Sequence, residues 1–167
     1  MSATLQPAIP DQLDEQAEHL MRRLCDKDLT IATAESCTGG MLAALLTDIE
    51  GAGHAFERGF VTYTKQSKTE LLGIDPDLLD QNDAVSEPVA RAMAEGALDR
   101  SKADLALGVT GFAGPAGDGC EEGLVHFALA QRDQPTQHRV EHFGAAGRGP
   151  VRVQSLKAML EMLEEAL

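Results

Sequence analysis

Strand-like and helix-like segments alternate along the chain, and this alternation constrains the fold more than any other feature. The segments that read as strands are residues 29–34, 59–63, 105–109, 124–130 and 139–143, and those that read as helices are residues 11–26, 38–48, 65–72, 86–99 and 150–166, with a short helix opening at Pro76. Interleaving of this kind predicts an α/β fold. The last two strands follow each other closely, so we expect them to pair antiparallel within a mixed sheet.

Amino-acid composition limits the expected number of domains, the cellular location and the binding partners of the chain. A chain of 167 residues predicts one domain, here residues 11–167 behind a loose tail, residues 1–10. The net charge of −13 opposes binding to nucleic acid and to anionic membranes, so neither is an expected partner. Three cysteines without CxxC spacing, and no signal peptide or membrane-spanning run, predict a cytoplasmic location. Low aromatic content permits a homodimer without requiring one.

A run of polar, thiol and glycine residues lies between the end of the first predicted strand and the next predicted helix. Its sequence is Ala34-Glu35-Ser36-Cys37-Thr38-Gly39-Gly40. The first N–H groups of a helix lack intrahelical partners, so such a place stabilises an anion or an oxyanion. A Ser or Cys held there could act as a nucleophile. Ordinary helix capping explains the same residue types, and no Walker A or Gly-x-Ser-x-Gly pattern is present.

Two further strand ends carry polar residues, and ligands of α/β sheets gather at the carboxyl ends of strands. These residues are Tyr63, Thr64, Lys65 and Lys68 after the second strand, and Thr110, Gly111, Ala113, Gly114 and Pro115 after the third. We therefore expect one pocket in which a nucleophile, a lysine, hydroxyls and backbone N–H groups meet.

A Ser–Lys pair is a known nucleophile and base, because a partly desolvated lysine can lose its proton near neutral pH. Lys68 is the candidate base, one helical turn beyond Thr64, although an exposed surface lysine is the commoner fate. Cys37 competes with Ser36 as nucleophile, and spacing alone does not decide between them. Tyr63 either orients the nucleophile or is a half-buried strand aromatic.

Two arginines lie four residues apart at the start of the last predicted helix. Arg148 and Arg152 suit a phosphate clamp, or are an exposed pair of surface cations. His138 and His142 are also four apart, but their segment alternates like a strand. At ~3.3 Å per residue they would lie about 13 Å apart, so no metal site is expected.

Several motifs together resemble one known family. Residues 34–40, Phe56-Glu57-Arg58-Gly59-Phe60-Val61-Thr62-Tyr63, Ala84-Val85-Ser86-Glu87-Pro88-Val89 and Gly108-Val109-Thr110-Gly111-Phe112-Ala113-Gly114-Pro115 occur in the order typical of the CinA C-terminal domain, named after competence/damage-inducible protein A. The resemblance spans about residues 12–166. It implies a three-layer α/β/α fold with a mixed, mostly parallel sheet.

The resemblance also implies an activity: nicotinamide-nucleotide amidohydrolase, which converts nicotinamide mononucleotide (NMN) and water to nicotinate mononucleotide and ammonia, a step of pyridine nucleotide salvage without a cofactor. The family's serine corresponds to Ser36 and its lysine to Lys68. Its glycine-rich loop corresponds to Thr110–Pro115, and its late arginine to Arg148. The expected catalytic residues are thus Ser36, Lys68, Tyr63 and Thr110. The expected substrate-binding residues are Thr38, Gly39, Gly40, Lys65, Gly111, Gly114, Arg148 and Arg152.

The sequence departs from the family pattern at three places. Lys65 stands where asparagine is usual, which adds a second cation that could depress the pKa of Lys68 or replace it as the base. The 116–123 loop is shorter and lacks Lys-Pro, and Gly147 replaces an aspartate before Arg148. These departures leave two alternatives open, which are a non-catalytic nucleotide-binding or regulatory module and an amidohydrolase of another phosphorylated amide.

Overall fold

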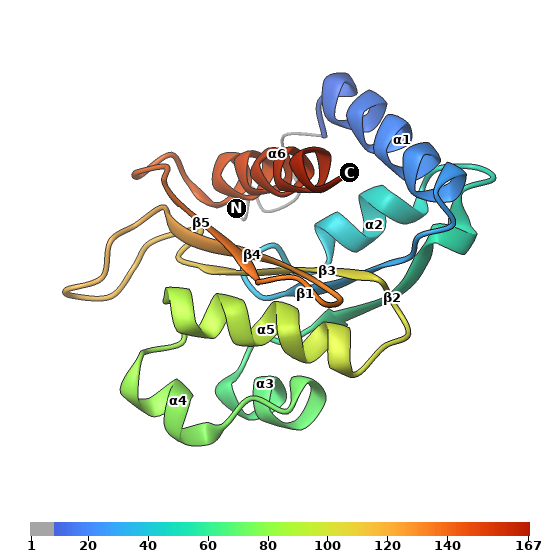
Figure 1. Cartoon of the computed structure of the whole chain (residues 1–167). Helices are drawn as coiled ribbons and strands as arrows, with labels where there is room; N and C mark the ends of the chain where they lie inside the picture. Colours follow the sequence, from blue (N-terminus) through green and yellow to red (C-terminus); the bar gives the residue numbers. More distant parts are fainter. Residues whose placement is uncertain (1–8) are drawn as a thin grey trace.

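The computed structural model describes residues 9–167, which form one five-stranded sheet with helices on both faces (Figure 1). The expected tail lies outside the described residues up to residue 8. In chain order the elements are α1 (Asp11–Asp26), β1 (Ile31–Glu35), α2 (Met41–Thr47), the short 3₁₀ helix η1 (Gly53–Ala55), β2 (Phe56–Val61), α3 (Lys65–Leu72), α4 (Pro76–Gln81), α5 (Glu87–Asp99), β3 (Leu105–Gly111), β4 (Leu124–Gln131), β5 (Gln137–His142) and α6 (Arg148–Ala166).

The strand order is β2-β1-β3-β4-β5. Strand β1 pairs in parallel with β2 and with β3, whereas β4 runs antiparallel to both β3 and β5. The mixed sheet and the antiparallel pairing of the last two strands are therefore confirmed. Helices α1, α2 and α6 cover one face and α3, α4 and α5 the other, which gives the three layers seen in Figure 1. The parallel strands β2, β1 and β3 bring three carboxyl ends to the same edge of the sheet.

Most predicted elements are confirmed, with shifted boundaries that have local causes. The helix expected from residue 38 begins only at Met41, because Gly39 and Gly40 have φ angles of +66° and +95°. Strand β2 begins earlier and ends earlier than expected, and α6 begins two residues earlier, at Arg148. Ser86 precedes α5 as expected, but its hydroxyl donates to the Asp83 carbonyl and makes no capping bond to the helix.

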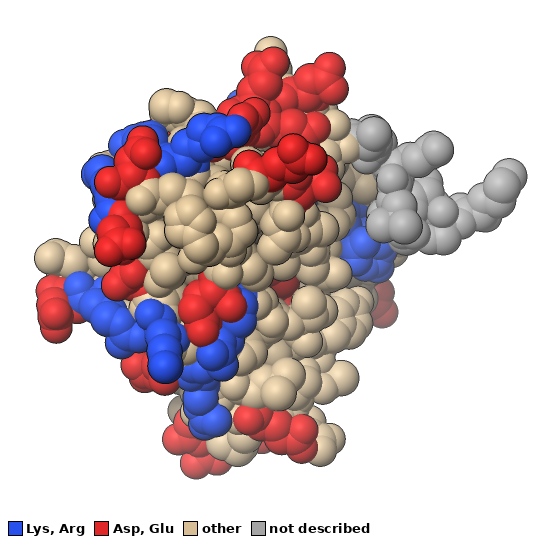
Figure 2. Space-filling view, turned by 90° about the vertical axis from the view of Figure 1, so that its right-hand side faces the viewer, with Lys and Arg blue, Asp and Glu red and all other residues tan. Residues whose placement is uncertain are grey.

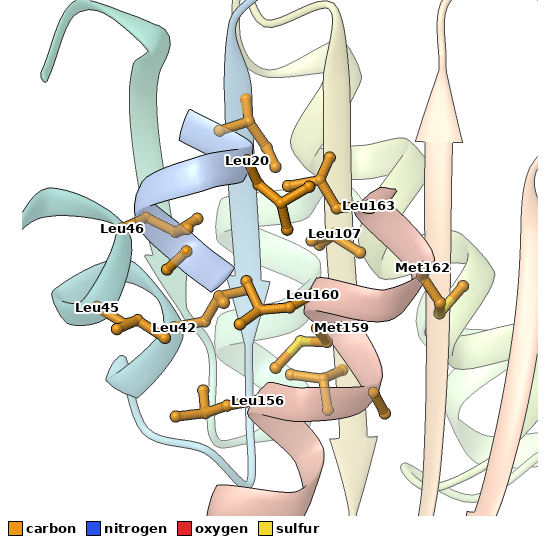
Figure 3. Close-up of a cluster of buried hydrophobic side chains, with 14 of the residues drawn as sticks. Leu20, Leu42, Leu45, Leu46, Leu107, Leu156, Met159, Leu160, Met162 and Leu163 are labelled. Carbon is orange, nitrogen blue, oxygen red and sulfur yellow. The ribbon is translucent and has the colours of Figure 1, made fainter. Parts of the chain in front are cut away.

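A leucine- and methionine-rich core fixes α6 over α2 and β3. Its central side chains come from α1, α2, β3 and α6, and are Leu20, Leu42, Leu45, Leu46, Leu107, Leu156, Met159, Leu160, Met162 and Leu163 (Figure 3). Each is almost completely buried, and a buried leucine or methionine contributes roughly 1.5–3 kcal/mol relative to an exposed one. The start of α6, which carries both arginines, is consequently held at a fixed position beside the start of α2.

The surface is mixed in charge on the face that Figure 2 shows, where basic side chains lie next to acidic ones. Ion pairs at the molecular surface include Arg22 with Glu18, both exposed, and Arg58 with the partly buried Glu57. No helix among residues 9–167 is both long enough and apolar enough to cross a membrane.

The strand assignment of the 137–142 segment is also confirmed, since it forms β5. A histidine pair was not predicted from the sequence: His126 Nδ1 lies 3.0 Å from Nε2 of His138. Among residues 9–167, no group of three or more His, Cys, Asp or Glu side chains is arranged to hold a metal ion.

Candidate functional site

The four predicted catalytic residues and three of the predicted substrate-binding residues meet in a pocket of about 210 Å³ at the carboxyl ends of β1, β2 and β3. It is lined by Ser36, Cys37, Tyr63, Lys68, Ala84, Val85, Thr110, Gly111, Phe112, Ala113, Gly114, Pro115 and Arg148. A larger cleft of about 430 Å³ lies between α1 and α2, but its lining has no serine, cysteine or lysine that could act as a nucleophile or base. We therefore place the candidate site in the smaller pocket.

Ser36 continues β1 into the pocket. Its N–H donates to the Val109 carbonyl at 3.2 Å, which prolongs the β1–β3 pairing by one residue. The Gly39 N–H then donates to the Ser36 carbonyl at 3.2 Å, and this bond closes a turn over residues 36–39. The side chain of Ser36 is 8% exposed and lies at the pocket wall. The serine is thus fixed by the sheet on one side and by a tight turn on the other.

Lys68 reaches this serine from α3. Its Nζ lies 3.0 Å from Ser36 Oγ and donates to the Thr62 carbonyl at 2.8 Å. The side chain is 0% exposed, so the alternative of an exposed surface lysine is excluded. Burial removes water from the ammonium and lowers the pKa of Lys68 from 10.5 to about 8. Helix α3 positions the lysine through its capping box, in which Thr64 and Ser67 bond each other's backbone.

The two nucleophile candidates are separated by their surroundings. The Cys37 side chain packs into the hydrophobic cluster beneath α2 and α6. Burial raises the pKa of the Cys37 thiol to about 12, which leaves it protonated at neutral pH. Ser36, and not Cys37, is hydrogen-bonded to Lys68. The geometry accordingly favours the serine, which the residue pattern alone had left undecided.

Glu35 has a role that sequence analysis missed. Its buried carboxyl oxygens accept hydrogen bonds from the N–H groups of Leu42 and Ala43, at 3.0 and 2.8 Å. The carboxyl group therefore caps α2, and these two N–H groups are not available to an anion. The expectation of an anion site at the first turn of this helix is wrong for them. An acidic side chain at the end of a buried strand was the available signal.

A hydrogen bond from Thr110 holds the segment before α5 at the pocket. Its Oγ1 donates to the Ala84 carbonyl at 2.6 Å, and Ala84 and Val85 then form part of the pocket wall just before α5. Sequence analysis did not single out these two residues as site residues. The 84–89 motif of the family resemblance was the available signal, but the place of these residues at the pocket depends on a contact between positions 26 apart in the chain.

The two arginines of α6 have different surroundings. Arg148 lines the pocket, and its guanidinium lies against Gly114, where a Cβ would be 3.1 Å from Nη2. Arg152 is absent from the pocket lining, and its Nε donates to the Cys37 carbonyl at 2.7 Å. The structure thus brings only Arg148 to the pocket surface.

Some of the remaining predicted residues line the pocket and others lie outside it. Tyr63 lines the pocket but is 66% exposed, so it is not a half-buried strand aromatic. Gly111 and Gly114 also line it, whereas Thr38, Gly39 and Gly40 lie in the adjoining turn. Lys65 points elsewhere: its Nζ pairs with Asp80 at 2.9 Å, on the side of α3 that faces α4. The second cation expected beside Lys68 therefore lies outside the pocket.

These features define a class: α/β/α proteins with a buried serine–lysine pair at the carboxyl ends of parallel strands. Comparison with known proteins gives the family. Residues 13–167 match the model of the CinA C-terminal domain, and the chain belongs to this family. Two solved structures are closely similar. They are the competence/damage inducible protein CihA from Agrobacterium tumefaciens (TM-score 0.91, 39% identity, 99% of this chain and 98% of that one) and a CinA superfamily protein from Escherichia coli (0.88, 35%, 100% and 99%).

Curated relatives are longer proteins. A putative competence-damage inducible protein from Symbiobacterium thermophilum is 54% identical over 113 residues, which cover 66% of this chain and 26% of that protein. A CinA-like protein from Mycobacterium marinum is 44% identical over 155 residues, or 91% of this chain and 36% of that protein. The chain thus spans about a quarter to a third of the length of these relatives. Their names establish the family and state no substrate.

Proposed function

We propose that this chain is a serine amidohydrolase that converts nicotinamide mononucleotide and water to nicotinate mononucleotide and ammonia. The observation that carries the proposal is the buried Lys68 ammonium, 3.0 Å from Ser36 Oγ and with its pKa lowered to about 8. Membership of the CinA family, which includes amidohydrolases, supports it. The choice of substrate rests on the resemblance of the motifs around Ser36, Lys68 and the 108–115 loop.

The acylation step uses Lys68 as a proton carrier. In its neutral form Lys68 takes the proton of the Ser36 hydroxyl, and Oγ attacks the carboxamide carbon of the substrate. The C–N bond then breaks, and the proton on Lys68 passes to the departing nitrogen, which leaves as ammonia. We assign stabilisation of the negative oxygen of the tetrahedral intermediate to backbone N–H groups of the turn after Ser36 other than that of Gly39, which bonds the Ser36 carbonyl.

Deacylation repeats the same proton transfers with water. Neutral Lys68 takes a proton from a water molecule, whose oxygen attacks the acyl carbon. The bond to Ser36 Oγ breaks, the serine recovers its proton from Lys68, and the product leaves as the carboxylic acid, which ionises to the carboxylate by giving its proton to solvent. One buried base on one side of the serine suffices for both halves, because it is neutral again after each.

Arg148 provides the positive charge that a phosphorylated substrate needs. The chain carries a net charge of −13, so an anionic ligand must be held by a local cation. Arg148 is the arginine in the pocket lining, and a guanidinium pairs well with phosphate oxygens. Replacing Arg148 with Gln should raise the KM for NMN much more than it lowers kcat.

The direct test is ammonia release from NMN by the purified protein, with nicotinate mononucleotide identified by chromatography. Ser36→Ala and Lys68→Met should each abolish turnover, while a thermal-shift measurement shows that both variants remain folded and still bind NMN. Wild-type turnover in Ser36→Ala would refute the serine mechanism. Stabilisation of the wild type by NMN without turnover would instead indicate a binding module, and no stabilisation would indicate another amide substrate.

A further inference from the structure

We propose that Arg152 is a positioning residue, which holds the turn that carries Ser36 in its reactive geometry and does not bind the substrate phosphate. The inference rests on the proposed role of Ser36 as nucleophile. It assigns different tasks to two arginines that lie one helical turn apart and that the sequence presented as one clamp.

The contacts of Arg152 point at the turn. Its Nε donates to the Cys37 carbonyl at 2.7 Å. Its guanidinium also packs beside Gly39, where an added Cβ would lie 3.4 Å from Nη2. Arg148, by contrast, lines the pocket. The side chain that could meet a phosphate and the side chain that touches the turn are therefore different.

The peptide groups around Ser36 and Cys37 have different anchors. The Ser36 N–H is held by the sheet through Val109, and the Ser36 carbonyl is held by the Gly39 N–H. Among residues 9–167, the Cys37 carbonyl accepts a hydrogen bond from Arg152 alone. Arg152 is thus the anchor of the peptide group between Cys37 and Thr38.

Fixing this carbonyl also fixes an N–H group. A trans peptide is planar, so its C=O and N–H point in opposite directions. With the Cys37 carbonyl turned toward Arg152, the Thr38 N–H is turned away from α6. The orientation of one N–H donor directly after the nucleophile therefore depends on a side chain more than 100 positions later in the chain.

Helix α6, which carries Arg152, is firmly packed against its neighbours. Helix α6 packs through Leu156, Met159 and Leu160 against the leucines of α2, as Figure 3 shows. The φ angles at Gly39 and Gly40 are both positive, and glycine adopts such angles without strain. Glycine also has the greatest backbone freedom of all residues, so these two residues do little to hold the turn in one conformation. A permissive turn needs an external anchor, because a misplacement of ~1 Å at a reacting group can cost about 100-fold in rate.

Two variants separate the hydrogen bond from the charge. In Arg152→Gln the side-chain nitrogen Nε2 stands at the same number of bonds from Cα as Nε of arginine, so a donor to the Cys37 carbonyl remains while the charge is lost. Arg152→Met has similar length but neither donor nor charge. Lys157→Gln is the matched control, since it removes one positive charge from the exposed side of α6.

The experiment measures the reactivity of Ser36 with a neutral alkyl fluorophosphonate, which has no anionic phosphate to be recognised. Ser36 Oγ forms a bond to phosphorus, fluoride leaves, and the hydroxyl proton passes to Lys68. Intact-protein mass spectrometry gives the labelling rate, and Ser36→Ala is the blank. In parallel, NMN-induced thermal shifts report on substrate binding, and the melting temperature of each variant reports on folding.

The expected result is labelling about 10- to 100-fold slower in Arg152→Met, and within a few fold of the wild type in Arg152→Gln and Lys157→Gln. NMN-induced shifts should be the same in all of them. Equal labelling of Arg152→Met and wild type, or loss of the NMN-induced shift in both Arg152 variants, would overturn the inference and leave the serine mechanism standing. No labelling of Ser36 in the wild type would refute the nucleophile, and with it both proposals.

Discussion

Replacing Lys68 with Met should abolish activity. At neutral pH it should also remove the free-energy cost of burying a charged ammonium group. The pKa of Lys68 is about 8 in the folded protein, against a reference value of 10.5 for the unfolded chain. Below pH 8 the lysine is charged in both states, so the folded state carries the full cost of desolvating the charge. Because one pH unit corresponds to about 1.4 kcal/mol, this cost is roughly 3 kcal/mol.

The sign of the pH dependence follows from proton binding. Between about pH 8 and pH 10.5 the unfolded chain binds more protons at this lysine than the folded protein does. The free energy of unfolding of the wild type therefore rises with pH in this window, relative to a variant without the lysine. Between pH 7 and pH 10 the free energy of unfolding of the wild type should rise by about 2–3 kcal/mol relative to that of Lys68→Met. This rise corresponds to roughly 5–10 °C in Tm for a domain of this size.

The absolute difference at pH 7 is smaller than this cost, because Met also leaves the Thr62 carbonyl without its donor. An unpaired buried carbonyl costs about 1–3 kcal/mol, and that loss is the same at both pH values. Urea unfolding of wild type and Lys68→Met at pH 7 and pH 10 gives the comparison, with the exposed Lys157→Met as a control for loss of a lysine. A stability difference between wild type and Lys68→Met that does not change with pH would refute the reasoning.

Three further outcomes are expected. The kcat/KM for amide hydrolysis should rise with pH and level off above about pH 8, because only neutral Lys68 accepts the serine proton; a profile already flat from pH 6 would contradict the base assignment. Glu35→Gln should lower the free energy of unfolding by about 1–2 kcal/mol in urea titrations, since it weakens the cap of α2, and an unchanged midpoint would show that the cap contributes nothing. Gly108→Ala should cost about 1–3 kcal/mol, because its Cβ would lie 2.8 Å from the Ala94 backbone nitrogen, whereas Gly117→Ala, with no neighbouring atom within 4 Å, should melt at the wild-type temperature.

The alternation of strands and helices could be predicted because it depends on neighbours in the sequence. The apolar run at residues 105–109 and the start of the helix after Ser86 follow from hydrophobic pattern and local backbone preference, and the structure confirms both. Boundaries were less predictable. The late start of α2 depends on two glycine φ angles, which hydrophobic periodicity does not reveal.

The chemistry of the site depended more on tertiary structure. Residue type alone made Ser36 and Cys37 equal candidates, and made Arg148 and Arg152 one clamp. The structure separates each pair by direction: Ser36 meets Lys68 while Cys37 enters the core, and Arg148 lines the pocket while Arg152 holds a carbonyl. Ser36 and Cys37 follow the end of β1, so the turn over residues 36–39 and the packing of α2 and α6 set the directions of their side chains, which no local pattern specifies.

The sequence by itself determined the α/β class, the acidic surface and the gathering of polar residues at three strand ends, since these follow from composition and local pattern. Only the tertiary structure decided that Lys68 is buried against Ser36, that Glu35 caps α2 and that Arg152 donates to the Cys37 carbonyl. Each of these depends on how layers pack across the sheet. A lysine acquires a pKa of about 8 only when folding removes the water around it, and no local pattern specifies that burial.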